Sequence, residues 1–112
     1  MSYIYHHVAL VRVIDGDSLV LEIDLGNKIT WRDSFRLSGI DAPEMSAVGG
    51  EEAKAHLEGL LGLGVCRVET FKPDKFGRWL AEVYIAVRSG EMSANKLMVL
   101  DGHAVPYSGG KR

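Results

Sequence analysis

The most restrictive feature of this sequence is an alternation of apolar and polar residues in its first third, the period-two pattern of half-buried β-strands. In residues 18–25 the odd positions carry Leu, Leu, Ile and Leu, while the even positions are mostly polar. Residues 29–38 alternate in the same way, and the β-branched run 8–14 precedes both. Asp-Gly at 15–16 and Gly-Asn at 26–27 separate the runs and are typical of hairpin turns. We therefore expect an antiparallel meander of three strands.

The middle of the chain changes to helical spacing. Between residues 51 and 61, apolar side chains recur three and four positions apart, two glutamates stand in the first turn, and glycines follow the last turn. Strand character returns in 65–71 and 79–87, and a second short helix is predicted at 94–100.

This order of three strands, a helix, two strands and a helix is that of an OB-fold, a small barrel that commonly binds oligonucleotides. The sequence predicts a mainly β (α+β) fold: a five-stranded OB-fold β-barrel with two short helices. We expect a single domain over residues 1–112, in which residues 108–112 form a disordered tail.

Charge and composition limit which partners the chain can bind. It has 112 residues, and 13 Lys and Arg against 15 Asp and Glu give a net charge of −2. A nucleic acid must therefore be held by local cations rather than by the field of the whole molecule. No apolar run approaches the roughly 18 residues of a membrane span, and the first ten residues lack the pattern of a secretory signal. We expect no membrane partner and a cytoplasmic location.

Four short segments carry residues suited to chemistry: IDGD at 14–17, FRL at 35–37, IDAPE at 40–44 and KFGR at 75–78. Each alone has an ordinary explanation: a hairpin turn, a solvated arginine, a loop that starts a helix, and a basic turn. Together they place carboxylates and arginines at strand ends, where the loops of a barrel can converge. Oxygen ligands suit a hard cation such as Ca²⁺ or Mg²⁺, and arginines offer planar donors that match a phosphate. This combination is suited to phosphodiester hydrolysis.

The ordered set IDGDS, FRLSGIDAPE and KFGR resembles the staphylococcal nuclease (thermonuclease) family, and the similarity runs over residues 8–107. The resemblance implies an OB-fold barrel and a Ca²⁺-dependent endonuclease that cleaves DNA and RNA with little sequence specificity and leaves 3′-phosphate ends. By the same motifs it implies the following roles: Asp17, Asp41 and the backbone carbonyl of Ala42 as metal ligands, Glu44 as the acid that activates the attacking water, Arg36 and Arg78 as catalytic residues that bind the phosphate, and Asp15 as an acid behind the metal ligands.

The sequence departs from the family pattern at the expected substrate-binding residues. Phe76 stands where well-known members have a tyrosine that helps to hold a substrate phosphate, next to Lys75, which we also expect to bind substrate. Tyr107 matches a tyrosine near the nucleotide base once a gap is allowed. The sequence given also stops before the family's C-terminal helix. These departures bear on affinity and substrate preference more than on the chemistry.

Two other functions stay open at this point. A non-catalytic OB-fold module could bind nucleic acid or a protein partner, and a nuclease subunit could depend on a larger assembly for its affinity. Family-like domains without activity have generally lost the acidic and arginine positions, whereas all of them are present here. We therefore favour the enzyme.

Overall fold

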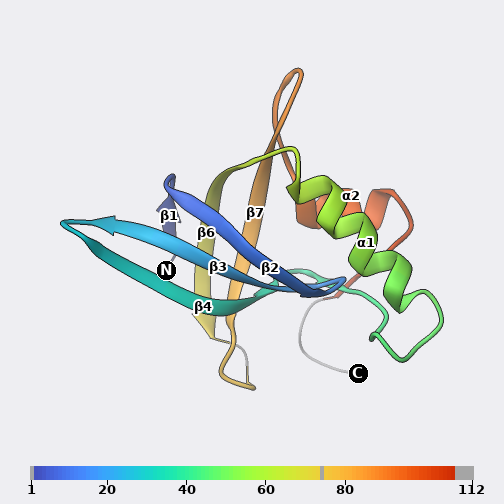
Figure 1. Ribbon diagram of the computed structural model, residues 1–112. Helices are drawn as coiled ribbons and strands as arrows, with labels where there is room; N and C mark the ends of the chain where they lie inside the picture. Colours follow the sequence, from blue (N-terminus) through green and yellow to red (C-terminus); the bar gives the residue numbers. More distant parts are fainter. Residues whose placement is uncertain (1, 74, 108–112) are drawn as a thin grey trace.

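The computed structural model describes residues 2–73 and 75–107 (Figure 1). The predicted tail at 108–112 lies outside these residues. Most of the described chain forms strands. In chain order the elements are β1 (Tyr3–Tyr5), β2 (Val8–Asp15), β3 (Ser18–Gly26), β4 (Ile29–Leu37), β5 (Ile40–Asp41), α1 (Gly50–Leu61), β6 (Val65–Pro73), β7 (Trp79–Val87), β8 (Gly90–Ser93), α2 (Ala94–Leu100) and β9 (Val105–Pro106).

The strand order confirms the predicted fold class. The main sheet runs β1-β6-β7-β4-β3-β2, and β8 adds to β7. Strands β2, β3 and β4 form the predicted antiparallel meander, and β4 pairs with β7 in parallel. With α1 between the third and fourth of its five long strands, the molecule has the partly open barrel of an OB-fold. The two edge strands of this sheet are β1 and β2, and the described strands do not pair β2 with β6. Instead β1, which precedes β2 in the chain, pairs with β6.

Four short strands were not predicted from the sequence: β1, β5, β8 and β9. They are two to four residues long, too short to show an alternation. Each is defined by its partner strand rather than by its own residues, as in the antiparallel pair of β5 with β9. This pair matters for function, because β5 carries the aspartate of the IDAPE segment.

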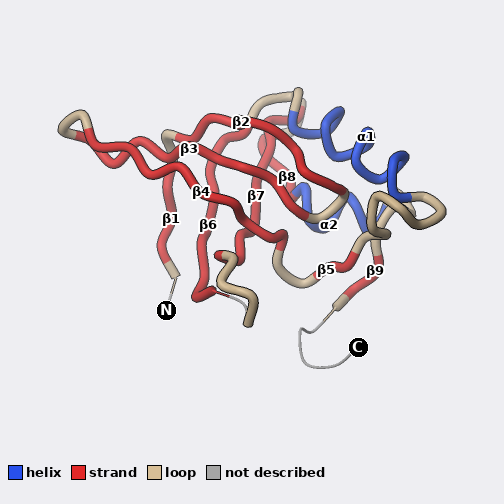
Figure 2. Tube along the Cα trace, turned by 60° about the horizontal axis from the view of Figure 1, so that its bottom comes forward, coloured by secondary structure: helices blue, strands red, loops and turns tan. Residues whose placement is uncertain are grey.

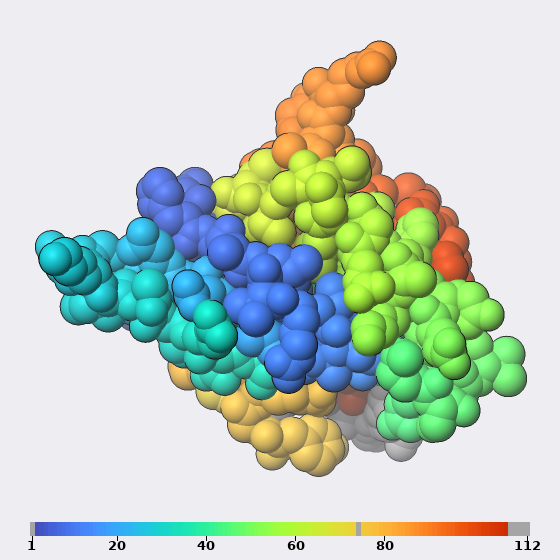
Figure 3. Space-filling view, viewed as in Figure 1, coloured from blue at the N-terminus to red at the C-terminus, as the bar shows by residue number. Residues whose placement is uncertain are grey.

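The core confirms the predicted apolar face of β3, where Leu19, Leu21 and Ile23 are fully buried. The two helices lie side by side against the strands and cover part of this core (Figures 1 and 2). The apolar pattern continues beyond the core at the β3–β4 hairpin, where Leu25 and Ile29 are 45% and 56% exposed. They are exposed because the hairpin projects from the body of the molecule (Figure 3). Among the described residues, no helix is both long and apolar enough to cross a membrane.

Candidate active site

The β2–β3 turn and the end of β4 bring the first two predicted site residues together. The register of β3 and β4 sets Ser18 opposite Arg36. The N–H of Leu37 also donates to the carbonyl oxygen of Asp17 over 2.8 Å. The turn that carries Asp17 is therefore tied by backbone bonds to the strand that carries Arg36.

The guanidinium group of Arg36 contacts two carboxylates. Its Nη2 lies 3.5 Å from Oδ2 of Asp17 and 3.1 Å from Oδ1 of Asp41. The side chains of Arg36 and Asp17 are only 11% and 10% exposed, and that of Asp41 is 27% exposed. Charges this buried are tolerated only when they are paired. Arg36 thus holds the two acids as near neighbours, although they are far apart in the sequence.

A second bond fixes the IDAPE segment against the β2–β3 turn. The N–H of Ala42 donates to Oδ2 of Asp17 over 2.9 Å, and Ala42 is buried. On its other side Asp41 pairs with Val105 of β9. The peptide of Ala42 is therefore held at the carboxylate of Asp17, which brings the third expected ligand residue to the same place.

Asp15 and Ser18 lie around Asp17. The N–H of Asp17 donates to Oδ1 of Asp15 over 3.1 Å, and Oγ of Ser18 donates to Oδ1 of Asp17 over 3.2 Å. Burial, followed by the interaction with the Asp17 side chain, raises the pKa of Asp15, although the backbone bond from Asp17 opposes this rise. Arg78 joins the group because its Nη1 donates to Oγ of Ser18 over 3.4 Å. The sequence assigned no role to Ser18, although this residue ends the IDGDS motif.

Glu44 lies two residues after Ala42, in the loop that leads to α1. Its side chain is exposed, and its carbonyl oxygen accepts a hydrogen bond of 2.9 Å from the N–H of Ala47. The same carbonyl packs on Gly50 so closely that a Cβ there would lie 1.9 Å from its oxygen. Gly50 is the second residue that the sequence did not single out, since a glycine at a helix start has no distinctive pattern.

The three expected substrate-binding residues flank the two arginines. The ring of Tyr107 lies 5.1 Å from Cζ of Arg36. The ring of Phe76 lies 5.9 Å from Cζ of Arg78 and 5.5 Å from Nζ of Lys75. Each arginine thus has an aromatic neighbour at the mouth of the site.

The oxygen atoms at this site are of the kind that binds a hard cation. Among residues 2–73 and 75–107 no three His, Cys, Asp or Glu side chains form a group that could hold a metal ion by themselves. The two carboxylates on Arg36, together with the backbone oxygen of Ala42 next to Asp41, would give the all-oxygen ligand set that Ca²⁺ takes, with water completing the shell. Counting Asp15 and Arg78, three acids face two arginines, and the net negative charge that remains favours a cation.

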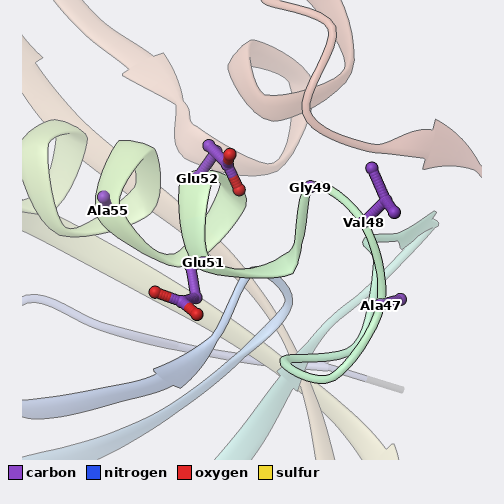
Figure 4. Close-up of a pocket in the computed structure, with 6 residues that line it drawn as sticks. All are labelled: Ala47, Val48, Gly49, Glu51, Glu52 and Ala55. Atoms are coloured by element: carbon purple, nitrogen blue, oxygen red, sulfur yellow. The ribbon is translucent and has the colours of Figure 1, made fainter.

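Two surface hollows adjoin this region. One is lined by residues of the site and of the chain before β9, among them Asp41, Ala42 and His103. Figure 4 shows the other, at the start of α1, lined by Ala47, Val48, Gly49, Glu51, Glu52 and Ala55. Its lining holds two carboxylates and no cationic side chain, so it is not suited to a phosphate.

Comparison with known proteins identifies one family. The family model described as "Staphylococcal nuclease homologue" matches residues 34–111, a span that contains Arg36, Asp41, Glu44 and Arg78 and begins after Asp17. A protein named "Micrococcal nuclease" from Shigella flexneri is 33% identical over 103 residues, which cover 88% of this chain and 56% of that protein.

Two further relatives carry nuclease names. An "Uncharacterized endonuclease" of Escherichia coli O157:H7 is 33% identical over 101 residues, 90% of this chain and 61% of that protein. The "Probable staphylococcal-like nuclease CAN2" of Oryza sativa subsp. japonica is 30% identical over 70 residues, 62% of this chain and 18% of that protein. The chain therefore spans less than two thirds of the length of each of these relatives.

Proposed function

This chain belongs to the staphylococcal nuclease family, and we propose that it is a Ca²⁺-dependent endonuclease that hydrolyses phosphodiester bonds of DNA or RNA. We further propose that it cleaves with little sequence specificity and leaves 3′-phosphate ends. The nuclease names of its relatives support the reaction class. We infer the calcium dependence, the residue roles and the products from the motifs and the geometry of the site.

The observation that carries the proposal is the contact of Arg36 with both Asp17 and Asp41. A guanidinium carries one positive charge, so two carboxylates beside it leave a net negative charge that favours a cation. Here two carboxylates share one guanidinium, so the pocket has oxygen ligands to spare for a cation and a planar donor beside them. A bound phosphate can use both groups, because its oxygens can bind the cation and accept from the guanidinium.

We propose the following role for each residue. Arg36 and Arg78 bind the phosphate oxygens and stabilise the negative charge that grows during the reaction. Glu44, with its exposed side chain, accepts a proton from the attacking water. When bound at Asp17 and Asp41, Ca²⁺ supplies Lewis-acid polarisation of a phosphate oxygen. The water oxygen bonds to phosphorus as the bond to the 5′ oxygen breaks. The 5′ oxygen leaves as a hydroxyl that takes its proton from solvent, and Arg78, beside Ser18, stabilises the charge on it.

A cleavage assay with a matched pair of variants tests the proposal. Chelation should abolish cleavage of an end-labelled oligonucleotide, Ca²⁺ should restore it, and the products should carry 3′-phosphates. Arg36→Gln should lower the rate by ~10²–10³, the usual worth of such a donor. Arg32→Gln is the control, since Arg32 is on the same strand but pairs with Glu22 at the surface.

Two results would contradict the proposal. Full cleavage in excess chelator would exclude the metal mechanism. Absence of cleavage by the folded parent under every metal condition would instead favour a non-catalytic binding module.

A further inference from the structure

The hollow that adjoins Asp41 has no part in the mechanism proposed above. Its volume of about 440 Å³ lies within the range of small-molecule binding sites. It opens directly beside the candidate metal ligands, because Asp41 and Ala42 are part of its lining. Apart from Asp41 and His103, the residues that line it are glycine, alanine, proline and valine. A surface of this kind suits the flat, weakly polar ring of a base better than it suits a second phosphate.

Backbone and side-chain contacts fix His103 at the wall of this hollow. Its N–H donates to the carbonyl oxygen of Met98 over 2.9 Å, which ties it to the last turn of α2. Its ring stacks on that of His56 of α1, with the centroids 4.3 Å apart and the planes inclined by 22°. Nε2 of His56 in turn lies 2.7 Å from Oδ2 of Asp101, the residue that ends α2. Among the described residues that line the hollow are His103 and not His56, so the ring face that His56 leaves uncovered is on the side of the hollow.

The two nucleotides joined by the cleaved bond lie on different sides of the site. In the proposed mechanism the 5′ oxygen leaves beside Arg78, so the nucleotide on the 3′ side of the bond lies toward the β6–β7 loop. The phosphate stays on the other nucleotide as its 3′-phosphate, held by Arg36. Figure 2 shows the β6–β7 loop on one side of the end of β4, and β5 with β9 on the other. The hollow is lined by Asp41 of β5 and Val105 of β9, so it lies on the side that remains for the nucleotide that keeps the phosphate.

We propose that this hollow is the subsite for the nucleotide on the 5′ side of the cleaved bond, and that the base of this nucleotide stacks on His103. Every base has a π-face, so such stacking adds affinity without selecting a sequence. The bond between His56 and Asp101 holds the stacked imidazoles in place, so the platform exists before a nucleotide binds. This inference rests on the proposed function, because it takes Arg36 to hold the phosphate of the product.

Binding of single nucleotides tests the inference, because a monophosphate has no diester to cleave. NMR titrations of the protein in Ca²⁺ compare three probes: thymidine 3′-monophosphate, the corresponding abasic sugar 3′-phosphate, and inorganic phosphate. The nucleotide should bind about 5- to 100-fold more tightly than the abasic sugar phosphate, the range that one stacked base gives. His103→Ala should remove most of this difference and should leave the affinity for inorganic phosphate within about twofold of the parent's.

Two further variants separate stacking from other effects. His103→Phe keeps a flat ring without the two nitrogens and should retain the preference for the nucleotide. His6→Ala is the matched control, since His6 is an exposed histidine between β1 and β2 and outside the hollow, and all three affinities should stay unchanged. A further readout needs no variant: the ring protons of His103 should show a ring-current shift with thymidine 3′-monophosphate and not with the abasic sugar phosphate.

Three results would overturn the inference. The first is equal binding, or no binding, of the nucleotide and the abasic sugar phosphate by the folded parent. The second is a parent-like preference in His103→Ala. The third is a loss of inorganic phosphate binding in His103→Ala equal to the loss of nucleotide binding, which would make the imidazole a phosphate ligand instead.

The outcome is separable from that of the proposed function. A parent that cleaves oligonucleotides but does not prefer the nucleotide over the abasic sugar phosphate contradicts only the subsite. A parent that binds the nucleotide through His103 but never cleaves contradicts only the enzyme.

Discussion

Substituting Gly50 should displace the proposed general base without touching its side chain. Gly50 begins α1, and a Cβ at this position would lie 1.9 Å from the carbonyl oxygen of Glu44 and 2.9 Å from Cα of Met45. Ordinary van der Waals contact begins at 3.4 Å. Both atoms belong to the backbone, which cannot rotate away as a side chain can. In Gly50→Ala the loop must therefore shift by about 1.5 Å in this closely packed region.

From this displacement we estimate the loss of stability and the loss of cleavage rate. Overpacking of this kind costs about 1–3 kcal/mol of unfolding free energy. A shift of ~1 Å at a catalytic group can cost as much as ~10²-fold in rate. Gly50→Ala should thus cleave about 10- to 100-fold more slowly. Its affinity for an oligonucleotide in chelator should stay near that of the parent, because the arginines are not part of this contact.

Gly59→Ala provides the matched control within the same helix. A Cβ at Gly59 meets nothing within 4 Å, so this variant should gain about 0.5–1 kcal/mol from helix propensity and keep the parent's rate. Urea unfolding, initial cleavage rates and anisotropy in chelator measure the three quantities. The reasoning is refuted if Gly50→Ala is as stable and as active as Gly59→Ala. A variant that loses stability but cleaves at the parent's rate would refute the positioning of Glu44 alone.

The remaining predictions concern the proposed general base Glu44, the buried Asn95, and the salt dependence of oligonucleotide binding. Glu44→Gln should lower the cleavage rate by ~10²–10⁴ and leave oligonucleotide binding intact, because it removes the base but keeps the shape. Asn95, fully buried, donates to the carbonyls of Ser38 and Ala81, each over 2.9 Å. It also accepts from the N–H of Val83, so Asn95→Ala should lower the unfolding free energy by about 2–4 kcal/mol in a urea titration. The logarithm of the single-strand binding constant should fall with the logarithm of the salt concentration by a slope equivalent to about two to four phosphate contacts, at roughly −0.7 per contact.

Each of these has a clear contrary result. Parent-rate cleavage by Glu44→Gln would remove it from the mechanism. A loss below about 0.5 kcal/mol in Asn95→Ala would mean that solvent or a rearranged backbone satisfies the groups it leaves. A salt slope near −10, that of a strongly basic binder, would mean that a basic surface has been overlooked.

The sequence predicted those parts of the fold that depend on local pattern. The alternation around Leu19 and Leu21 identified β3 and its buried face, and the helical spacing predicted α1 to within one residue at its start. The short strands could not be predicted, because β5 and β9 exist only through their pairing across the chain. Nor did the pattern show that the β3–β4 hairpin extends past the core, which leaves Leu25 and Ile29 exposed.

The candidate site, like the fold, was predicted only in part. Motif resemblance picked out Asp17, Arg36 and Asp41, and the structure brings them together through the guanidinium of Arg36. Their proximity follows from the register of β3 on β4 and from the β5–β9 pair. Both depend on the tertiary fold and not on local sequence pattern. The close approach of Gly50 to the Glu44 carbonyl is likewise invisible until the loop is folded against α1.

The central claim is that Asp17 and Asp41 hold a divalent cation beside Arg36. A cation that binds only the folded protein stabilises it by about 2.7 kcal/mol at a hundredfold excess over Kd. For a domain of this size that raises Tm by about 10 °C or more. In Asp41→Asn, Oδ1 can still accept from Arg36, while one ligand charge and the salt bridge to Arg36 are lost.

The most direct measurement is therefore a set of four melting curves, parent and Asp41→Asn, each in chelator and in saturating Ca²⁺. The parent should show the full calcium shift. Whatever its melting temperature in chelator, Asp41→Asn should show a much smaller calcium shift than the parent. A parent without a shift, or an Asp41→Asn variant that keeps the parent's full shift, would contradict the placement of the metal at this site.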